Sequence, residues 1–293
     1  MDLEQSAFEA LRFAPAQSLT LYKQPLVITS SGGKDSDVLL RLAENSGIPF
    51  EVIHSLTTAD APETVYHVRD TFRRMEEKGV KCVIDAHVQP DGSRLTMWNL
   101  IPKYFAPPTR IVRYCCAVLK EGDGKGRFIA TGVRWSESVR RKNSRGLIEV
   151  SNRDKNKRLI LMDDNDETRM QFENCQMKGR RVVNPIIGWG NKEVWDYAET
   201  EKICMNPLYG CGHTRVGCIG CPLASKRARI EEFIIWPKYK QSYIRAFDRM
   251  LEVRRMAGKS GSWQTGIDVF HAWMENGVLP GQEVLEEFRE DLI

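Results

Sequence analysis

The segment Ser30-Ser31-Gly32-Gly33-Lys34-Asp35-Ser36 constrains the fold of this chain more than any other feature of the sequence. It follows an apolar run at 25–29 that is typical of a buried strand, and it leads into an amphipathic helical pattern at 37–46. Two glycines let the backbone bend close to a phosphate group, and the amides at a helix N-terminus point toward a bound anion. The serines add hydroxyl donors, Lys34 adds a positive charge, and Asp35 adds either a contact for magnesium or a helix cap. The segment lacks the GxxxxGK pattern of a Walker loop, so it predicts another kind of phosphate-binding loop, with a structural Gly-Gly turn as the alternative.

Strand-like and helix-like patterns alternate through the first two thirds of the chain. The apolar runs lie at 25–29, 50–56, 80–85 and 127–133, and the helical patterns at 37–46, 63–78 and 191–202. Strands separated by crossover helices predict an α/β fold with a largely parallel sheet covered on both faces. Helical patterns follow at 237–256, near 269–273 and at 283–292. We therefore expect an α/β nucleotide-binding domain over 1–223, which includes the cysteine-rich segment, and a helical C-terminal extension over 224–293.

The composition excludes several classes of protein. With 42% hydrophobic and 28% charged residues, the chain is typical of a globular protein, and no apolar run approaches the ~20 residues that span a bilayer. The first residues lack the basic-then-apolar pattern of a secretion signal. We expect a cytoplasmic protein, in which the eight cysteines serve as metal ligands or reactive thiols before disulfides.

Basic side chains are concentrated in the middle of the chain, although the net charge is only +4. Residues 110–158 contain 14 Lys and Arg against five Asp and Glu. Such a basic block predicts an anionic ligand, either a nucleotide or a polynucleotide, whereas the alternative is a solvated charged loop.

Four of the cysteines form two close pairs, Cys115-Cys116 and Cys218-Ile219-Gly220-Cys221. A CxxC pair presents two thiolates to one metal, and distant cysteines can complete the coordination. One alternative is a structural zinc site, and another is redox thiols without a metal. The zinc site would draw on Cys204, Cys211, His213, Cys218 and Cys221.

SGGKDS resembles the signature of the PP-loop ATP pyrophosphatase superfamily, and three further segments resemble the phosphoadenosine phosphosulfate (PAPS) reductase family within it. Residues 58–64 resemble the PET motif of that family, 131–138 with Arg141 resemble its TGxRxxES segment, and 184–195 resemble its NPI and VW stretch. The motifs occur in order between about residues 26 and 223. The resemblance implies a Rossmann-like, HUP-type fold that binds an adenine nucleotide. It implies that the phosphates are bound by Ser31, Gly32, Gly33, Lys34, Asp35 and Ser36, and that Thr58, Glu63, Gly132, Arg134 and Arg141 line the cleft.

The cysteine pairs resemble those of adenylylsulfate reductases that carry a 4Fe–4S cluster, and those of cluster-bearing relatives in DNA phosphorothioation. This resemblance implies that Cys115, Cys116, Cys218 and Cys221 ligate a 4Fe–4S cluster, with Cys211 as an alternative to one of the adjacent pair. Sulfonucleotide reductases attack the substrate with a cysteine near the C-terminus, but no cysteine follows Cys221 in this sequence. Cys175 and Cys204 are the candidates for a substitute thiol.

Three functions are compatible with these features. The one we favour is an ATP-dependent enzyme in which Mg·ATP adenylates a substrate, pyrophosphate leaves, and the cluster handles sulfur, with Lys34, Asp35 and Arg134 as catalytic residues. Its expected partners are a sulfur-donor protein and a polynucleotide that docks on residues 110–158. The alternatives are a sulfonucleotide reductase with an unconventional thiol and a non-catalytic nucleotide-binding accessory protein.

Overall fold

The structure is a computed structural model that describes residues 2–120, 126–151, 158–161, 180–259 and 261–275. The chain divides into two compact units, each built from separate stretches of sequence. The first unit comprises 1–54, 63–84 and 123–216, and the second comprises 55–62, 85–122 and 217–293. The cysteine pairs therefore belong to the same unit as the C-terminal helices, which differs from the expected division at residue 223.

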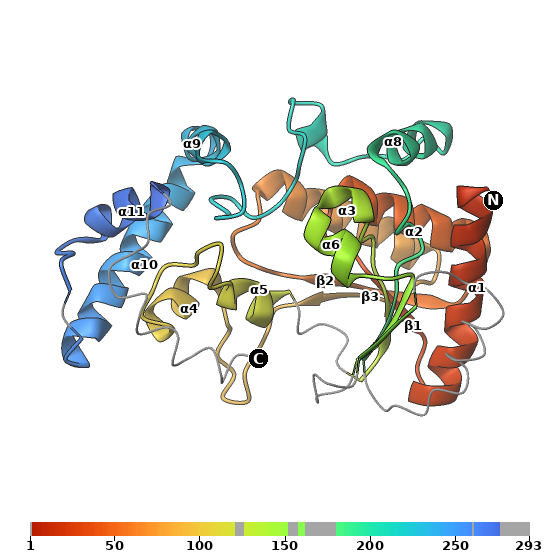
Figure 1. Cartoon of the computed structure of the whole chain (residues 1–293), viewed down its shortest axis with the longest axis horizontal. Helices are drawn as coiled ribbons and strands as arrows, with labels where there is room; N and C mark the ends of the chain where they lie inside the picture. Colours follow the sequence, from red (N-terminus) through yellow and green to blue (C-terminus); the bar gives the residue numbers. More distant parts are fainter. Residues whose placement is uncertain (1, 121–125, 152–157, 162–179, 260, 276–293) are drawn as a thin grey trace. The chain divides into compact units, whose positions relative to one another are not determined.

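The described strands form one seven-stranded sheet in the order β3-β2-β1-β4-β7-β5-β6, of which Figure 1 labels β1, β2 and β3. β1 is parallel to β2 and β4, and β4 is parallel to β7, whereas β5 pairs antiparallel with both β6 and β7. The first five positions follow the 3-2-1-4-5 arrangement of a Rossmann-type sheet, with β7 in the place of the fifth strand. The predicted α/β class is therefore confirmed. The antiparallel edge was not expected. The strand bounds are β1 Leu26–Thr29, β2 Phe50–Ser55, β3 Cys82–Asp85, β4 Phe128–Ala130, β5 Ile148–Ser151, β6 Arg158–Leu161 and β7 Arg180–Val183.

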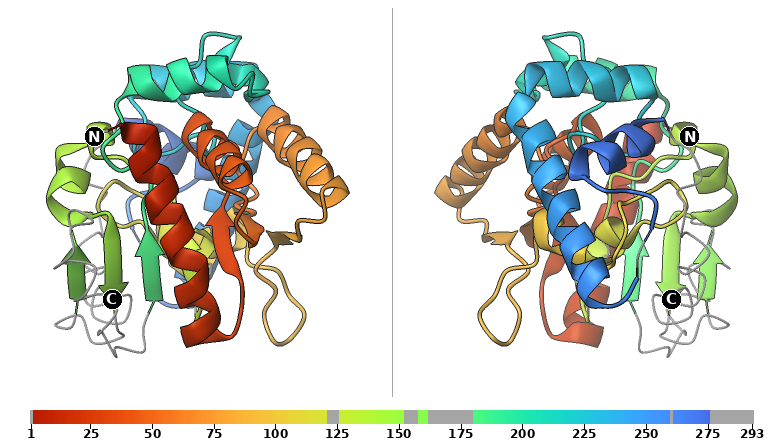
Figure 2. Two further views of the ribbon diagram at one scale, coloured as in Figure 1. Left: turned by 90° about the vertical axis from the view of Figure 1, so that its right-hand side faces the viewer. Right: turned by 90° about the vertical axis from the view of Figure 1, so that its left-hand side faces the viewer.

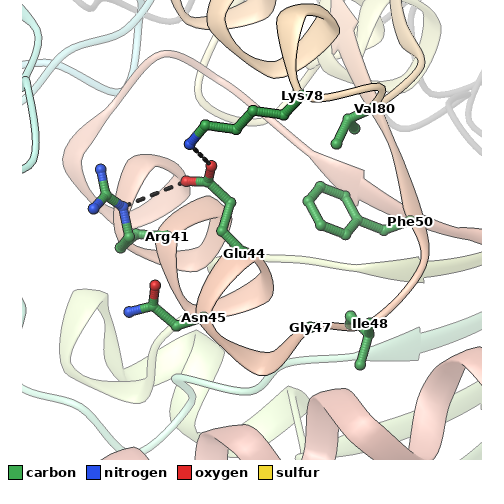
Figure 3. A pocket seen from close by; sticks show the side chains of 8 residues that line it. All are labelled: Arg41, Glu44, Asn45, Gly47, Ile48, Phe50, Lys78 and Val80. Atoms are coloured by element: carbon green, nitrogen blue, oxygen red, sulfur yellow. Dashed lines mark hydrogen bonds and ion pairs between the residues drawn. The ribbon is translucent and has the colours of Figure 1, made fainter.

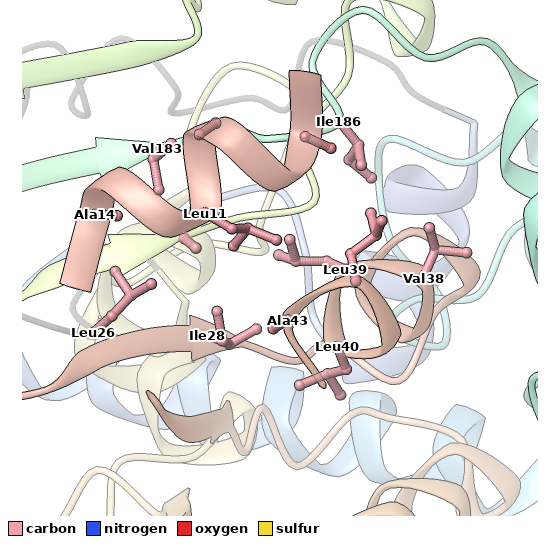
Figure 4. Close-up of a cluster of buried hydrophobic side chains, with 14 of the residues drawn as sticks. Leu11, Ala14, Leu26, Ile28, Val38, Leu39, Leu40, Ala43, Val183 and Ile186 are labelled. Carbon is pink, nitrogen blue, oxygen red and sulfur yellow. The ribbon is translucent and has the colours of Figure 1, made fainter. Parts of the chain in front are cut away.

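Helices α1 (Leu3–Tyr22), α2 (Lys34–Ser46), α3 (Pro62–Glu77) and α8 (Asn191–Thr200) contribute to one core on a face of this sheet. Helix α1 contacts β1, β4 and β7 in this layer (Figure 2). Its Leu11 lies near Leu26 and Ile28 of β1 and Leu39 of α2 (Figure 4). The remaining described helical segments of this unit are α6 (Val139–Ser144) and the 3-10 turns η1 (Trp135–Glu137) and η2 (Pro207–Tyr209).

Both faces of the sheet are buried. Leu26 and Ile28 enter the core under α1 and α2, whereas Val27 lies in a second cluster with Ile129 and Val182. Successive side chains of a strand point to opposite faces, so this alternation places the second cluster on the other face. The prediction of a sheet covered on both faces is confirmed.

The second unit is mainly helical. It contains α4 (Met97–Lys103), α5 (Tyr114–Leu119), α9 (Lys226–Ile235), α10 (Pro237–Met256) and α11 (Gly266–Met274). Helix α10 has the predicted bounds and buries Tyr243, Phe247 and Met250, and it contacts both α4 and α11. The helix predicted at 283–292 lies outside the described residues. Among the helices that the structure describes, none is both long and apolar enough to cross a membrane.

Candidate functional site

The phosphate-binding loop lies between β1 and α2, where close packing requires its glycines. Gly32 has a φ of +71°, and a Cβ atom there would lie 2.8 Å from Cγ2 of Val68 and 2.9 Å from Cγ2 of Thr64. Gly33 is the N-cap of α2, so the loop leads directly into the amide end of a helix. Because only glycine fits at position 32, the loop can press its backbone against α3.

Gly132 brings the loop after β4 against the phosphate-binding loop. A Cβ atom at this position would lie 2.8 Å from the carbonyl oxygen of Asp35 and 3.0 Å from its carbonyl carbon. Strands β1 and β4 are neighbours, and the strand order reverses between them. Ligands of open α/β sheets bind at such a reversal, beyond the carboxyl ends of the strands. Two of the segments predicted from sequence, 30–36 and 131–138, therefore meet at the position where a nucleotide is expected.

The three predicted catalytic residues lie together in the first unit. Asp35 is flanked by two cations, with its Oδ2 2.9 Å from Nζ of Lys34 and its Oδ1 2.8 Å from Nε of Arg134. Arg134 is buried, and it also donates hydrogen bonds to Ser136 Oγ, the carbonyl of Trp189 and Oδ1 of Asn191. The geometry thus holds both cations at the loop through the carboxylate between them.

The hydroxyls of Ser31 and Ser36 lie in the phosphate-binding loop, whereas Arg141 lies on α6. Ser36 Oγ donates to the carbonyl of Gly33 at 2.7 Å, and it lies 3.4 Å from Ser31 Oγ, so both hydroxyls lie within the loop. Arg141 of α6 forms an ion pair with Glu137, whose Oε1 accepts the backbone N–H of Arg134.

Glu63 belongs to the first unit and Thr58 to the second. Glu63 lies in the first turn of α3, next to Thr64, which contacts Gly32. Thr58 belongs to the second unit, where its Oγ1 accepts the N–H of Met97 and its φ is +63°.

A turn at 206–209 packs on the loop and was not identified from the sequence. Asn206 is buried, and its Nδ2 donates to the carbonyl of Gly32 at 2.8 Å and to Oγ1 of Thr64 at 3.1 Å. Tyr209 accepts the backbone N–H of Lys34 at its hydroxyl oxygen, at 2.9 Å. The Asn-Pro dipeptide at 206–207 indicates a turn, but it carries no information about the distant loop that the turn contacts.

A buried His–Asp pair lies beneath the loop and was also missed. Nε2 of His67 in α3 lies 2.9 Å from Oδ2 of Asp37 in α2, and both side chains are only 4% exposed. Burial raises the pKa of Asp37 above its usual value, against the opposing effect of His67. The pair links α2 and α3 directly behind the residues expected to bind phosphate.

The two predicted cysteine pairs come together in the second unit. Cys115 and Cys116 lie in the first turn of α5, and Cys218 and Cys221 lie in the loop before α9. A hydrogen bond with Cys116, burial, and the charges of Cys116, Cys218 and Cys221 raise the pKa of the Cys115 thiol. The four sulfur atoms therefore share one neighbourhood, as a common ligand set requires.

The surroundings of Cys218 are polar on one side. Its Sγ lies 3.4 Å from Oγ1 of Thr57 and 3.9 Å from Oδ1 of Asp60. The pKa of Lys120 is raised above its usual value, chiefly by its electrostatic interaction with Cys218, while burial raises the pKa of the Cys218 thiol itself. A hydroxyl group and an ammonium group thus accompany the sulfur atoms, and both can donate to thiolate or cluster sulfur.

The C-terminal helices hold the CxxC loop in place. Gly220 has a φ of +71°, and a Cβ atom there would lie 2.5 Å from Cζ of Phe233 in α9 and 3.1 Å from Cε2 of Tyr243 in α10. Its N–H donates to Oε2 of Glu232, and the hydroxyl of Tyr243 donates to the carbonyl of Ile219. The glycine of this motif is therefore required by the aromatic side chains that pack against it.

The donor set fits an iron–sulfur cluster in its chemistry, since it consists of four grouped thiols with polar second neighbours. Across the described parts of the chain, no three His, Cys, Asp or Glu side chains converge in the geometry of a single metal ion. Cys204 and Cys211 are exposed and belong to the first unit, as does His213, and Cys175 lies outside the described residues.

A cavity of about 450 Å³ lies at the C-terminal end of α2, which is the opposite end from the phosphate-binding loop. Glu44 at its wall is paired with Lys78 at 2.5 Å and with Arg41 at 3.4 Å (Figure 3). None of the site residues predicted from the sequence lines this cavity.

Residues 25–224 match the model of the phosphoadenosine phosphosulfate reductase domain. The chain belongs to the PAPS reductase family. It carries the adenine-nucleotide-binding domain of that family, as the sequence motifs indicated. An adenosine 5'-phosphosulfate reductase from Bacillus mycoides is 27% identical over 210 residues, which cover 69% of this chain and 75% of that protein. An uncharacterized protein from Methanocaldococcus jannaschii is 28% identical over 201 residues; these cover 68% of this chain and only 36% of that longer relative.

Among solved structures, this PAPS reductase family member is similar to the phosphate complex of the PAPS reductase from Candida auris. The TM-score is 0.45 at 18% identity, over 72% of this chain and 87% of that one. It is also similar to the U34-tRNA thiolase NcsA from Methanococcus maripaludis with its [4Fe-4S] cluster, with a TM-score of 0.41 at 15% identity, over 88% of this chain and 81% of that one.

Proposed function

We propose that this chain is an ATP-dependent enzyme that transfers AMP from Mg·ATP to an acceptor, releases pyrophosphate, and links this step to sulfur transfer. The observation that carries the proposal is the position of Asp35. Its carboxylate lies in the phosphate-binding loop between Lys34 and Arg134, and its side chain is 23% exposed. Although two cations flank it, this carboxylate can offer an oxygen to a divalent cation that arrives with an anionic substrate. ATP is such a substrate.

The roles of the loop residues follow from the charge that develops in the reaction. When the acceptor attacks the α-phosphorus, negative charge moves onto the leaving pyrophosphate. The α2 amides and the Lys34 ammonium would stabilise that charge, and Asp35 would hold a magnesium ion, which would supply further positive charge. Arg134 keeps Asp35 in place and adds positive charge beside the α-phosphate. Ser31, Ser36, Glu63, Gly132 and Arg141 complete the nucleotide site in this proposal.

Cys115, Cys116, Cys218 and Cys221 would hold the 4Fe–4S cluster. When bound, such a cluster would supply a redox-active centre beside these thiols. Within the chain, Thr57 and Lys120 place a hydroxyl and a positive charge beside Cys218. A sulfur-donor protein is the expected partner for this unit.

A polynucleotide remains our proposed acceptor, through the basic residues of 110–158. Several described members of that block already have partners inside the protein. Arg110 donates to the carbonyls of Pro222 and Ala224, Arg127 pairs with Glu51, and Arg145 pairs with Glu149. Docking therefore depends on the exposed remainder, such as Lys142, and the binding should weaken steeply with added salt.

ATP–pyrophosphate exchange, measured on anaerobically purified protein with and without nucleic acid, tests the proposal. We expect exchange in the wild type and its loss in Asp35→Ala. Asp70→Ala is the matched control, because Asp70 lies on the surface of α3 with a side chain 66% exposed. Exchange that is absent in the wild type, or that survives in Asp35→Ala, contradicts the proposal.

A reductase is the second candidate, and the Bacillus relatives are the observation that favours it. Cys204 is exposed in the first unit and is a thiol that such a reaction could use. Thioredoxin-dependent release of sulfite from PAPS, lost in Cys204→Ser, would establish it. Nucleotide binding without turnover in either assay would indicate an accessory protein.

A further inference from the structure

The groups that should bind phosphate are already engaged by the chain itself. The backbone N–H of Lys34, at the amide end of α2, donates to the hydroxyl oxygen of Tyr209 at 2.9 Å. The ammonium of Lys34 and the guanidinium of Arg134 are both paired with Asp35. A nucleotide must therefore exchange with these contacts when it enters the loop.

Tyr209 is placed firmly at this position. Its ring meets Trp195 edge-on, with centroids 5.2 Å apart, and the turn that carries it is bound to the loop through Asn206. A Cβ atom on Gly33 would lie 3.4 Å from the Tyr209 hydroxyl oxygen, so this oxygen lies beside the second glycine of the loop. Burial raises the pKa of Tyr209 to about 12, so the group at the helix end is a neutral phenol at neutral pH.

A neutral oxygen at a helix N-terminus is a weaker ligand than a phosphate oxygen. The partial positive charge at the end of α2 favours an anion, and a charged acceptor forms the stronger hydrogen bond with the amide. A phosphate oxygen can therefore replace the phenol oxygen on the Lys34 N–H, but the replacement gives up the hydrogen bond that Tyr209 makes in the empty site.

We propose that Tyr209 is an internal competitor for the nucleotide's phosphates: its hydroxyl oxygen accepts from the first amide of α2, and a phosphate oxygen that binds this amide displaces it. The inference rests on the proposed function, because it requires that the loop binds phosphate. It assigns to Tyr209 a role in setting the affinity for the phosphate chain, and none toward the adenosine part.

Tyr209→Phe separates this role from a supporting one. The variant keeps the ring and its contact with Trp195 but removes the competing oxygen. We expect Mg·ATP and inorganic pyrophosphate to bind about two- to tenfold more tightly, the range that one lost hydrogen bond allows. Adenosine, which has no phosphate, should bind with unchanged affinity. Tyr66→Phe is the control, since Tyr66 is 63% exposed on α3 and should leave all three affinities unaltered.

Calorimetric titration of wild type and variants with these ligands gives the dissociation constants. Trp195 supplies a second readout, because departure of Tyr209 should change its fluorescence in the wild type, and the change should vanish in Trp195→Phe. Equal or weaker binding of pyrophosphate by a folded Tyr209→Phe variant overturns the inference but leaves the proposed function standing. If the wild type binds neither ATP nor pyrophosphate, both fail. Should Tyr209→Phe unfold, the wild type alone decides: Trp195 fluorescence that stays unchanged as pyrophosphate binds overturns the inference.

Discussion

Nε of Arg134 lies 2.8 Å from Oδ1 of Asp35, and this ion pair connects the loop after β4 to the phosphate-binding loop after β1. The arginine side chain is 2% exposed and the aspartate side chain 23% exposed. The carboxylate thus faces both the protein interior and the site, and a change to it affects stability as well as binding.

Asp35→Asn should lower the free energy of unfolding by about 1–3 kcal/mol. Arg134 loses its charged partner while buried, but it keeps its hydrogen bonds to Ser136, Asn191 and the carbonyl of Trp189. Urea denaturation measures the change, with Asp70→Asn as the surface control. The same variant should lose the magnesium dependence of ATP binding. An unaltered urea midpoint would show that the pair does not support the fold.

Gly132→Ala should impair nucleotide binding at least tenfold, because the new Cβ atom meets the backbone of Asp35 at 2.8 Å and must displace the loop. Gly188→Ala is the matched control. Gly188 is an exposed glycine of the same unit, and a Cβ atom there meets nothing closer than Trp135 at 4.0 Å. Pyrophosphate titration of both variants checks the prediction, and equal affinities would contradict it.

Gly220→Ala should prevent assembly of the cluster site. The added Cβ atom would lie 2.5 Å from the Phe233 ring, and the position has a φ of +71°, which alanine adopts poorly. Gly217→Ala lies one residue before the same motif, and a Cβ atom there meets nothing within 4 Å. We expect normal iron and sulfide content in the control after anaerobic reconstitution and a large loss in Gly220→Ala. Equal iron content in the two would refute the packing argument.

Asp37 should make the stability depend on pH. Burial raises its folded pKa above the usual 3.8, so the native state binds this proton more tightly than the unfolded chain does. Stability from this group is therefore present at low pH and is lost as the pH rises from about 3.8 through the folded pKa. His67, Arg74 and Asp35 are the charged groups that act on it.

Replacing Asp37 with asparagine removes this ionisation. The stability of Asp37→Asn relative to the wild type should rise with pH across the acid range, as urea unfolding at several pH values would measure. Asp70→Asn should show no such trend. A relative stability that falls with pH would mean that the carboxylate is favoured by the fold in its charged form.

The sequence predicted the elements whose local pattern is strong. Helix α10 has its predicted bounds, and β1 and α2 flank the phosphate-binding loop as expected. Helix α1 was missed because its buried face consists largely of Ala7, Ala10 and Ala14 and because Pro15 lies inside it. Both features weaken the apolar periodicity from which a helix is recognised.

Interactions between distant residues account for the other omissions. Tyr209 and Lys34 are 175 positions apart, and Asn206 and Gly32 are 174 apart. The order of the strands in the sheet brings these segments together, and that order cannot be inferred from a single sequence. The cysteine pairs were found because their spacing repeats a known arrangement, whereas their grouping with α9 and α10 depends on the packing of Gly220 against Phe233.

The discontinuous second unit has a consequence for how the protein is made. Cys116 and Cys218 are 102 positions apart, and the intervening chain contributes mainly to the other unit. A ribosome that adds about 5–20 residues per second produces Cys218 roughly 5–20 s after Cys116. The first cysteine pair therefore leaves the ribosome well before the second, and α9 and α10, which fix the CxxC loop, follow later still. Insertion of a cluster at all four cysteines has to wait until Cys221, α9 and α10 have been made, so the nucleotide-binding fold can form before the cysteine site exists.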